Sequence, residues 1–81
     1  MDRQEIFEKV KEVLVAQFGE QAKSATENTV AQDIRGWDSF AHVVLLGVVE
    51  KKFGMKFGFN EIVNFTSVGA IVDTLEKKIN K

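Results

Sequence analysis

Two stretches of the chain carry hydrophobic residues at spacings of three and four, the pattern of helices that bury one face. The first runs from Asp2 to Phe18, and the second follows Thr66-Ser67 near the end of the chain. The expected buried stripes are Ile6, Val10, Val13, Leu14 and Phe18 in the first, and Val68, Ile71, Val72, Leu75 and Ile79 in the second. Asp2 is suited to cap the first helix, and Gly19 to end it in the left-handed conformation.

A third helical stretch, Ser39 to Phe53, is apolar on more than one face. We expect Gly54 to end this helix. Its residues expected to face inward are Phe40, Leu45, Leu46, Val49 and Phe53. Val43, Val44 and Val48 widen the hydrophobic arc beyond one stripe. Part of this surface must therefore pack against other helices or face a partner or ligand.

The connecting segments complete the predicted architecture. Residues 20–36 show no sustained period, and Val30 and Ile34 are expected to hold this long loop to the core. After a connector, Asn60 is expected to cap one short turn ending at Asn64, and Asp73 to pair with Lys77 one turn later on the last helix. The sequence therefore predicts an all-α, single-domain chain over residues 1–81. It is a small four-helix bundle, with three longer helices, one short helix and a long loop between the first two.

Composition and charge restrict the function. The 81 residues include 11 Lys+Arg, 12 Asp+Glu, one histidine and no cysteine, so the net charge is −1. This balance does not favour nucleic acid or an anionic membrane, and the missing thiols argue against a metal site or a thiolate nucleophile. So short a chain has little core left to frame a deep catalytic cavity. We expect a monomeric carrier, adaptor or binding module with no metal, no catalytic set and no membrane insertion, located in the cytoplasm because no apolar segment of signal or spanning length is present.

The most informative stretch is Gly36-Trp37-Asp38-Ser39-Phe40, where the polar loop meets the apolar helix. Ser39 lies at a helix N-terminus, where free backbone N–H groups and the helix dipole favour an anion such as a phosphodiester on the hydroxyl. Asp38 is suited to cap the helix or to help hold Mg²⁺ during phosphoryl transfer. Because aspartate and serine are common at helix starts, the pair alone indicates no more than capping.

The surrounding arrangement adds to this pair. Asp33, Gly36, Asp38, Ser39 and Phe40 follow one another in the order of a known attachment motif, Asp-Ser-Leu after a long loop. Further matches are the Phe53-Gly54 helix end and the Thr66-Ser67-Val68 helix start. Over nearly its whole length the chain resembles the acyl carrier protein family, the phosphopantetheine-bearing four-helix carriers of fatty acid and polyketide synthesis.

The resemblance implies that a phosphopantetheinyl transferase attaches 4′-phosphopantetheine from coenzyme A to Ser39. The terminal thiol of this cofactor then carries acyl groups as thioesters, which is consistent with a chain that lacks cysteine. The implied partners are acyl-activating or acyl-transferring enzymes, and a ketosynthase, of fatty acid, lipid or polyketide-type biosynthesis. The domain itself catalyses nothing and raises the effective concentration of its cargo.

The second helix departs from the family pattern. Ala41 and Val44 stand where the family is often acidic, and Lys51 and Lys52 follow Glu50. We expect a specialised set of partners, recognised by shape and buried area more than by charge. The expected partner surface comprises Trp37, Phe40, Ala41, His42, Val43, Val44, Gly47, Lys51 and Lys52. Phe40 replaces the family's usual leucine. Gly47 permits the close approach of another helix, leaves room for an acyl chain, or is a tolerated weak position in the helix.

In the family the third helix helps to shelter the acyl chain. The residues expected to line such a pocket are Leu45, Leu46, Phe57, Phe59, Ile62, Phe65 and Val68. Bulky rings there would equally well fill the space and leave the cargo exposed. His42 follows Ser39 by one turn and is expected beside the arm or against a partner, since no third residue completes a nucleophilic set.

Two alternatives remain open from the sequence. A carrier of aminoacyl cargo, of D-alanyl or peptidyl carrier type, would share Asp38-Ser39 and the helices. A helical interaction domain would use Ser39 only as a cap and would bind a partner helix through the apolar second helix.

Overall fold

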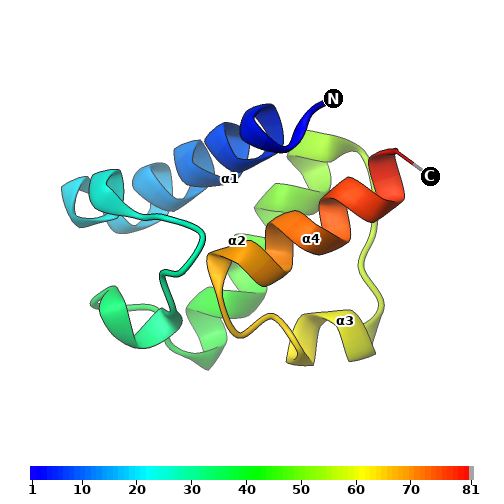
Figure 1. Ribbon diagram of the computed structural model, residues 1–81. Helices are drawn as coiled ribbons and strands as arrows, with labels where there is room; N and C mark the ends of the chain where they lie inside the picture. Colours follow the sequence, from blue (N-terminus) through cyan, green and yellow to red (C-terminus); the bar gives the residue numbers. More distant parts are fainter. Residues whose placement is uncertain (81) are drawn as a thin grey trace.

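Four α-helices follow one another along the chain, and the computed structural model describes residues 1–80 of it (Figure 1). They are α1 (Arg3–Phe18), α2 (Ser39–Phe53), α3 (Phe59–Val63) and α4 (Val68–Ile79). No strand occurs among these 80 residues, so the predicted all-α architecture is confirmed. No helix of the described part is both long and apolar enough to cross a lipid bilayer.

Side-chain caps begin the three longer helices. The carboxylates of Asp2 and Asp38 accept hydrogen bonds from the backbone N–H groups of Glu5 (2.9 Å) and Ala41 (2.8 Å), and the Ser67 hydroxyl accepts from Ala70 at 3.2 Å. These contacts satisfy N–H groups that have no partner within the helix.

Glycines end α1 and α2, but in two different conformations. Gly54 is left-handed (φ 67°, ψ 38°), as expected. Gly19, at φ 85° and ψ −160°, lies in an extended region of positive φ that is essentially restricted to glycine. The expected left-handed stop is therefore wrong for Gly19, although the requirement for glycine holds.

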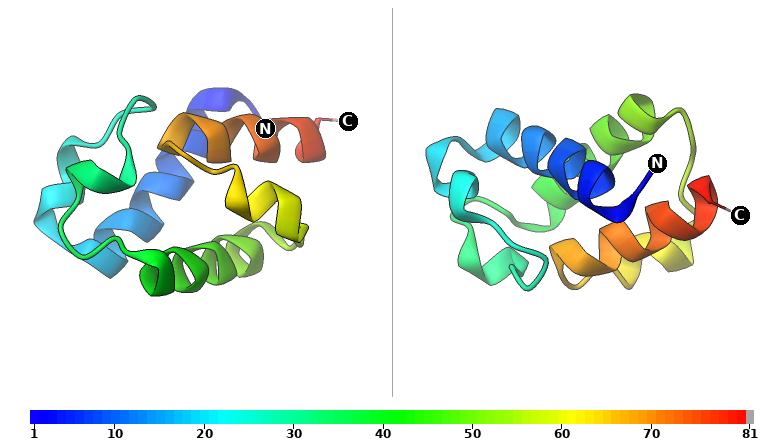
Figure 2. Two further views of the ribbon diagram at one scale, coloured as in Figure 1. Left: turned by 90° about the horizontal axis from the view of Figure 1, so that it is seen from below. Right: turned by 45° about the horizontal axis from the view of Figure 1, so that its top comes forward.

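The core is enclosed mainly by α1, α2 and α4, and α3 lies between α2 and α4 on one side of the bundle (Figures 1 and 2). The largest fully buried side chains come from these three helices: Ile6, Val10, Leu14, Leu45, Leu46, Val49, Val68, Ile71, Val72 and Leu75. Both termini lie at the same end of the bundle (Figure 2). The other end is formed by the long loop and the start of α2.

The loop between α1 and α2 is more ordered than its sequence suggests. It contains two 3₁₀ turns, Glu20–Ser24 and Ala31–Asp33. Ile34 is buried as expected, and Val30 forms an antiparallel bridge with Ser67. Small side chains that the hydrophobic pattern did not single out, Ala22 and Ala25, are buried as well. Small buried residues therefore hold this loop to the core together with its larger apolar residues.

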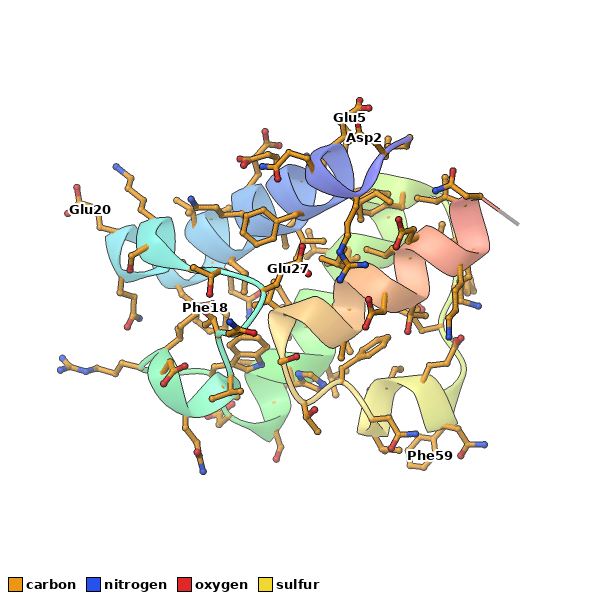
Figure 3. All side chains as sticks on the ribbon, in the orientation of Figure 1. Asp2, Glu5, Phe18, Glu20, Glu27 and Phe59 are labelled. Carbon is orange, nitrogen blue, oxygen red and sulfur yellow. The ribbon has the colours of Figure 1, made fainter. Side chains whose placement is uncertain are left out.

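Arg3 connects the loop to both terminal helices. Its guanidinium lies 2.5 Å from Glu27 of the loop, 2.7 Å from Asp73 and 2.8 Å from Glu76, and Figure 3 shows Glu27 on the loop beside α4. Hydrogen bonds to acidic side chains raise the pKa of Arg3 above its ordinary value, and the bond to Glu27 has the largest effect. The expected pairing of Asp73 with Lys77 is wrong, because a guanidinium in reach offers several donors at once.

The short helix α3 begins at Phe59, earlier than the expected cap at Asn60. Its start is fixed by Glu61, whose carboxylate accepts the Gly58 N–H at 2.7 Å. This hydrogen bond, followed by the ion pair with Lys78 at 3.2 Å, lowers the pKa of the Glu61 carboxyl. A side chain within the first turn, not the residue before it, therefore determines where the helix begins.

Candidate functional site

Ser39 is the first residue of α2 and is exposed to solvent. The capping acceptor of this helix is Asp38, and within residues 1–80 no hydrogen bond engages the Ser39 hydroxyl. The interpretation in which Ser39 itself caps the helix is therefore wrong. Its hydroxyl is free to react, in a position where the first-turn N–H groups stabilise an anion.

An open groove of about 510 Å³ lies beside Ser39, between α2 and α3. Its lining residues are Ala31, Trp37, Asp38, Ser39, His42, Val43, Phe59, Ile62, Val63 and Phe65. Apart from Asp38, Ser39 and His42 these side chains are apolar or aromatic. A molecule attached to the Ser39 hydroxyl therefore has an apolar surface directly beside its point of attachment.

Only part of the expected pocket lines this groove. Phe59, Ile62 and Phe65 do so, whereas Leu45, Leu46, Phe57 and Val68 are buried in the core. The reason is visible in the aromatic packing, since the rings of Phe57 and Phe65 meet edge to face with centroids 5.0 Å apart. Such a pair fills the interior beneath α3.

Two lining residues, Ala31 and Val63, were not anticipated. A signal for Val63 was present in the sequence. Phe59, Ile62 and Val63 stand at i, i+3 and i+4, which is one face of a helix that starts at Phe59. Ala31 lies in the loop, where no periodicity marks it.

Trp37 and His42 form one wall of the groove. Trp37 is 8% exposed, and its indole stacks on Phe18 and His42, with ring centroids 5.6 and 6.0 Å away. Its Nε1–H donates to His42 Nδ1 at 3.0 Å, and His42 Nε2 lies 3.2 Å from the Ile62 carbonyl oxygen. Trp37 therefore packs the loop against the helices and offers little free surface to a partner. Because both nitrogens of His42 have partners, neither is available to activate Ser39.

The outer face of α2 is apolar. We define it as Phe40, Val43, Val44, Gly47 and Val48, all of which are exposed, and no charged residue occurs in α2 before Glu50. The expected inward position of Phe40 is wrong, since the side chain is 79% exposed. Phe40 precedes the buried Val49 by nine residues, about two and a half helical turns, and so lies on the opposite face.

Other predicted surface residues fall around this face. Ala41 is half-buried, and its carbonyl accepts a hydrogen bond from Gln17. Lys51 and Lys52 are exposed beyond it, and Lys52 pairs with Glu12 of α1 at 3.1 Å. A Cβ added at Gly47 would meet no atom within 4 Å, so no helix approaches there and the interpretation of close packing is wrong.

The exposed apolar surface continues onto α3. Phe59 is 77% exposed and projects away from the bundle in Figure 3, and Val63 is exposed beside it. Together with the outer face of α2, these residues flank the groove next to Ser39. Within residues 1–80 no cluster of three His, Asp or Glu side chains is arranged to hold a metal ion.

Comparisons with known proteins agree with this geometry. The chain is 35% identical over 77 residues to an acyl carrier protein of Thermotoga maritima, covering 95% of each chain. It is 33% identical over 73 residues to one of Saccharopolyspora erythraea, covering 90% of this chain and 77% of that relative. The solved acyl carrier protein of Enterococcus faecalis superposes with a TM-score of 0.74 at 24% identity, over 95% of this chain and 98% of that one. No protein-family model matches the chain.

Proposed function

The chain belongs to the acyl carrier protein family, and on this premise we propose that it carries acyl groups on a 4′-phosphopantetheine arm attached to the Ser39 hydroxyl. The observation that carries the proposal is the free, exposed hydroxyl at the start of α2, beside an apolar groove. When attached, the arm supplies the thiol that binds the acyl group as a thioester, a group that this cysteine-free chain lacks.

The residues around Ser39 fit such an attachment. The first-turn backbone N–H groups of α2 would stabilise the phosphodiester anion, and the helix dipole adds to this effect. Asp38 already accepts the Ala41 N–H with one carboxylate oxygen, Oδ1. Its second oxygen would help to hold Mg²⁺ while the transferase acts, since carboxylate oxygen is a preferred ligand of that ion.

The groove favours apolar acyl cargo over aminoacyl cargo. Val43, Phe59, Ile62, Val63 and Phe65 offer apolar contact, which stabilises a hydrocarbon chain in proportion to the area it buries. An ammonium group would lose its hydration beside these side chains. We therefore propose fatty acyl or polyketide-type intermediates as the cargo.

The chain acts in this proposal as a substrate and shuttle, not as a catalyst. His42 has both ring nitrogens engaged and cannot serve Ser39 as a base. The partners of the chain would be a phosphopantetheinyl transferase and the enzymes that load, modify or remove the acyl group. We place their docking on the outer face of α2, whose apolar side chains are exposed next to Ser39.

Intact-mass spectrometry tests the attachment directly. After incubation with coenzyme A, Mg²⁺ and a broad-specificity phosphopantetheinyl transferase, the wild-type chain should gain one phosphopantetheine and Ser39→Ala none. The matched control is Ser67→Ala, the capping serine of α4. It should still be loaded fully while losing about 0.5–2 kcal/mol of stability. Addition to Ser39→Ala, or none to folded wild type with two different transferases, would contradict the proposal.

A second substitution tests the role of Asp38. Asp38→Asn keeps an oxygen that can cap the helix but removes the charge, so the stability of α2 should change little. If the carboxylate helps to hold Mg²⁺, loading should slow by roughly tenfold or more. An unchanged loading rate would leave Asp38 with capping alone.

A further inference from the structure

One hydrogen-bonded bridge joins three segments around the groove. Trp37 belongs to the end of the loop, His42 to α2 and Ile62 to α3. The indole Nε1–H donates to His42 Nδ1 at 3.0 Å, and His42 Nε2 lies 3.2 Å from the Ile62 carbonyl oxygen. The attachment of an arm to Ser39 does not require this bridge.

The chemistry of the three groups fixes the state of the imidazole. An indole N–H is a donor only, so His42 Nδ1 must be the unprotonated acceptor. A carbonyl oxygen is an acceptor only, so Nε2 must carry the proton and donate it to Ile62. Both contacts therefore exist together in one form of the ring, the neutral Nε2–H tautomer.

The helix held by this bridge has few other attachments. No residue of α3 is buried; Ile62 and Glu61 are half-buried, and Phe59 and Val63 are exposed. On the α4 side it is tied by the ion pair between Glu61 and Lys78. Within residues 1–80, the contact of His42 with Ile62 is the one hydrogen bond between α2 and α3.

We propose that His42 is a positioning residue that sets the spacing of α2 and α3 and thereby selects the size of the acyl chain that the groove shelters. The Trp37 indole N–H determines the tautomer of His42, and in that tautomer His42 donates its Nε2–H to the Ile62 carbonyl oxygen of α3. A longer chain requires α3 to move away from Val43, which breaks the Nε2–H bond to Ile62. A shorter chain leaves the bond intact. This inference rests on the proposed function, because it concerns the cargo of Ser39.

Nitrogen NMR of the unloaded protein tests the bridge without any cargo. Long-range ¹H–¹⁵N correlation spectra of the single histidine should show a protonated Nε2 and an unprotonated Nδ1 at neutral pH. Trp37→Phe keeps an aromatic ring for stacking but removes the N–H donor, so the tautomers should become mixed. A mixed or Nδ1–H tautomer in the wild-type chain would overturn the proposal.

Amide hydrogen exchange tests whether His42 holds α3. His42→Ala should speed exchange at residues 62–65 by roughly three- to tenfold, the worth of one hydrogen bond. The matched control is Val48→Ala, which truncates an exposed side chain of α2 away from the groove and should leave these rates unchanged. His42→Gln keeps an N–H donor at similar reach and should restore slow exchange. Equal rates in His42→Ala and wild type would overturn the proposal.

The selection of cargo is measured on loaded protein. Acyl-pantetheine arms of increasing chain length are attached, loading is verified by mass, and thioester cleavage by hydroxylamine is timed. Protection from cleavage should extend to longer chains in His42→Ala than in wild type, and His42→Gln should follow wild type. Identical profiles of protection against chain length would overturn the proposal. A failure of loading would count against the function of Ser39, whereas the two measurements on unloaded protein would still decide the bridge.

Discussion

The helices α2 and α4 are built alike at their ends but differ on their outer faces. Each begins with a side-chain cap and carries two lysines in its last turn. α4 buries Val68, Ile71, Val72 and Leu75 and turns Asp73, Lys77 and Lys78 outward. α2 also buries an apolar stripe, yet its outer face is apolar too.

The difference shows which surface folding itself requires. The apolar residues of α4 are accounted for by the core, and its exposed residues keep it in water. The exposed Phe40, Val43, Val44 and Val48 of α2 contribute little to the core, and contiguous apolar surface of this kind marks interaction sites. The face next to Ser39 is therefore the surface on which we place the docking of partner enzymes.

The largest effect expected from this comparison is on stability. Leu75→Ala removes a fully buried side chain of α4 and should lower the free energy of unfolding by about 2–5 kcal/mol. Val44→Ala truncates an exposed side chain of α2 and should change it by less than about 0.5 kcal/mol. Urea denaturation followed by circular dichroism measures both. Comparable losses would show that the outer face of α2 supports the fold after all.

A glycine of α4 should be the next most sensitive position. The Gly69 N–H donates to the Glu27 carbonyl oxygen at 2.8 Å, and a Cβ added at Gly69 would lie 2.8 Å from that same oxygen. Because backbone must move to relieve this contact, Gly69→Ala should cost about 1–3 kcal/mol. Thermal unfolding measures the loss. Wild-type stability in this variant would show that the loop yields without cost.

The glycine of α2 should respond in the opposite direction. Nothing surrounds a Cβ at Gly47, and alanine is the better helix former, so Gly47→Ala should stabilise the chain by about 0.5–1 kcal/mol. The rate of phosphopantetheine loading of Gly47→Ala tests whether the transferase contacts this position. Slower loading of this more stable variant would identify Gly47 as a point of contact with the transferase, and an unchanged rate would place the contact elsewhere on the outer face.

The smallest effect is a dependence of α3 on pH. The folded-state pKa of Glu61 is lowered, chiefly by the Gly58 N–H, so its contribution is present above the ordinary glutamate pKa of about 4.3 and is lost as pH falls through the lower folded value. Amide spectra should therefore show α3 loosening as the pH falls below the ordinary glutamate pKa. Glu61→Gln should abolish this dependence on pH. Equal loosening in wild type and Glu61→Gln would assign the effect to another group.

Local signals in the sequence account for most of the architecture. The caps Asp2, Asp38 and Ser67 and the stop Gly54 act on their own neighbours along the chain, so the three longer helices could be placed from the sequence. Ser39 could be singled out for the same reason. Its freedom from capping could not be predicted, because aspartate and serine are both good caps and only the folded geometry shows which of them acts.

The remaining features depend on contacts between distant parts of the chain. Arg3 forms ion pairs with Glu27, Asp73 and Glu76, and His42 hydrogen-bonds to Ile62. No periodicity in the sequence indicates either set of contacts. Gly69 is required by a loop some forty residues earlier in the sequence. The wrong prediction for Phe40 has another cause. Its apolar character suggested an inward position, but its angle around the helix places it opposite Val49.

The position of Trp37 also makes the chain its own optical reporter. The chain contains one tryptophan and no tyrosine, so near-ultraviolet emission arises from this one indole. The indole lines the groove beside Ser39, and its Nε1–H donates to His42. Attachment of the proposed arm, filling of the groove and displacement of α3 would each change the surroundings of this fluorophore. Unlabelled protein can therefore report each stage of loading in real time by its intrinsic fluorescence.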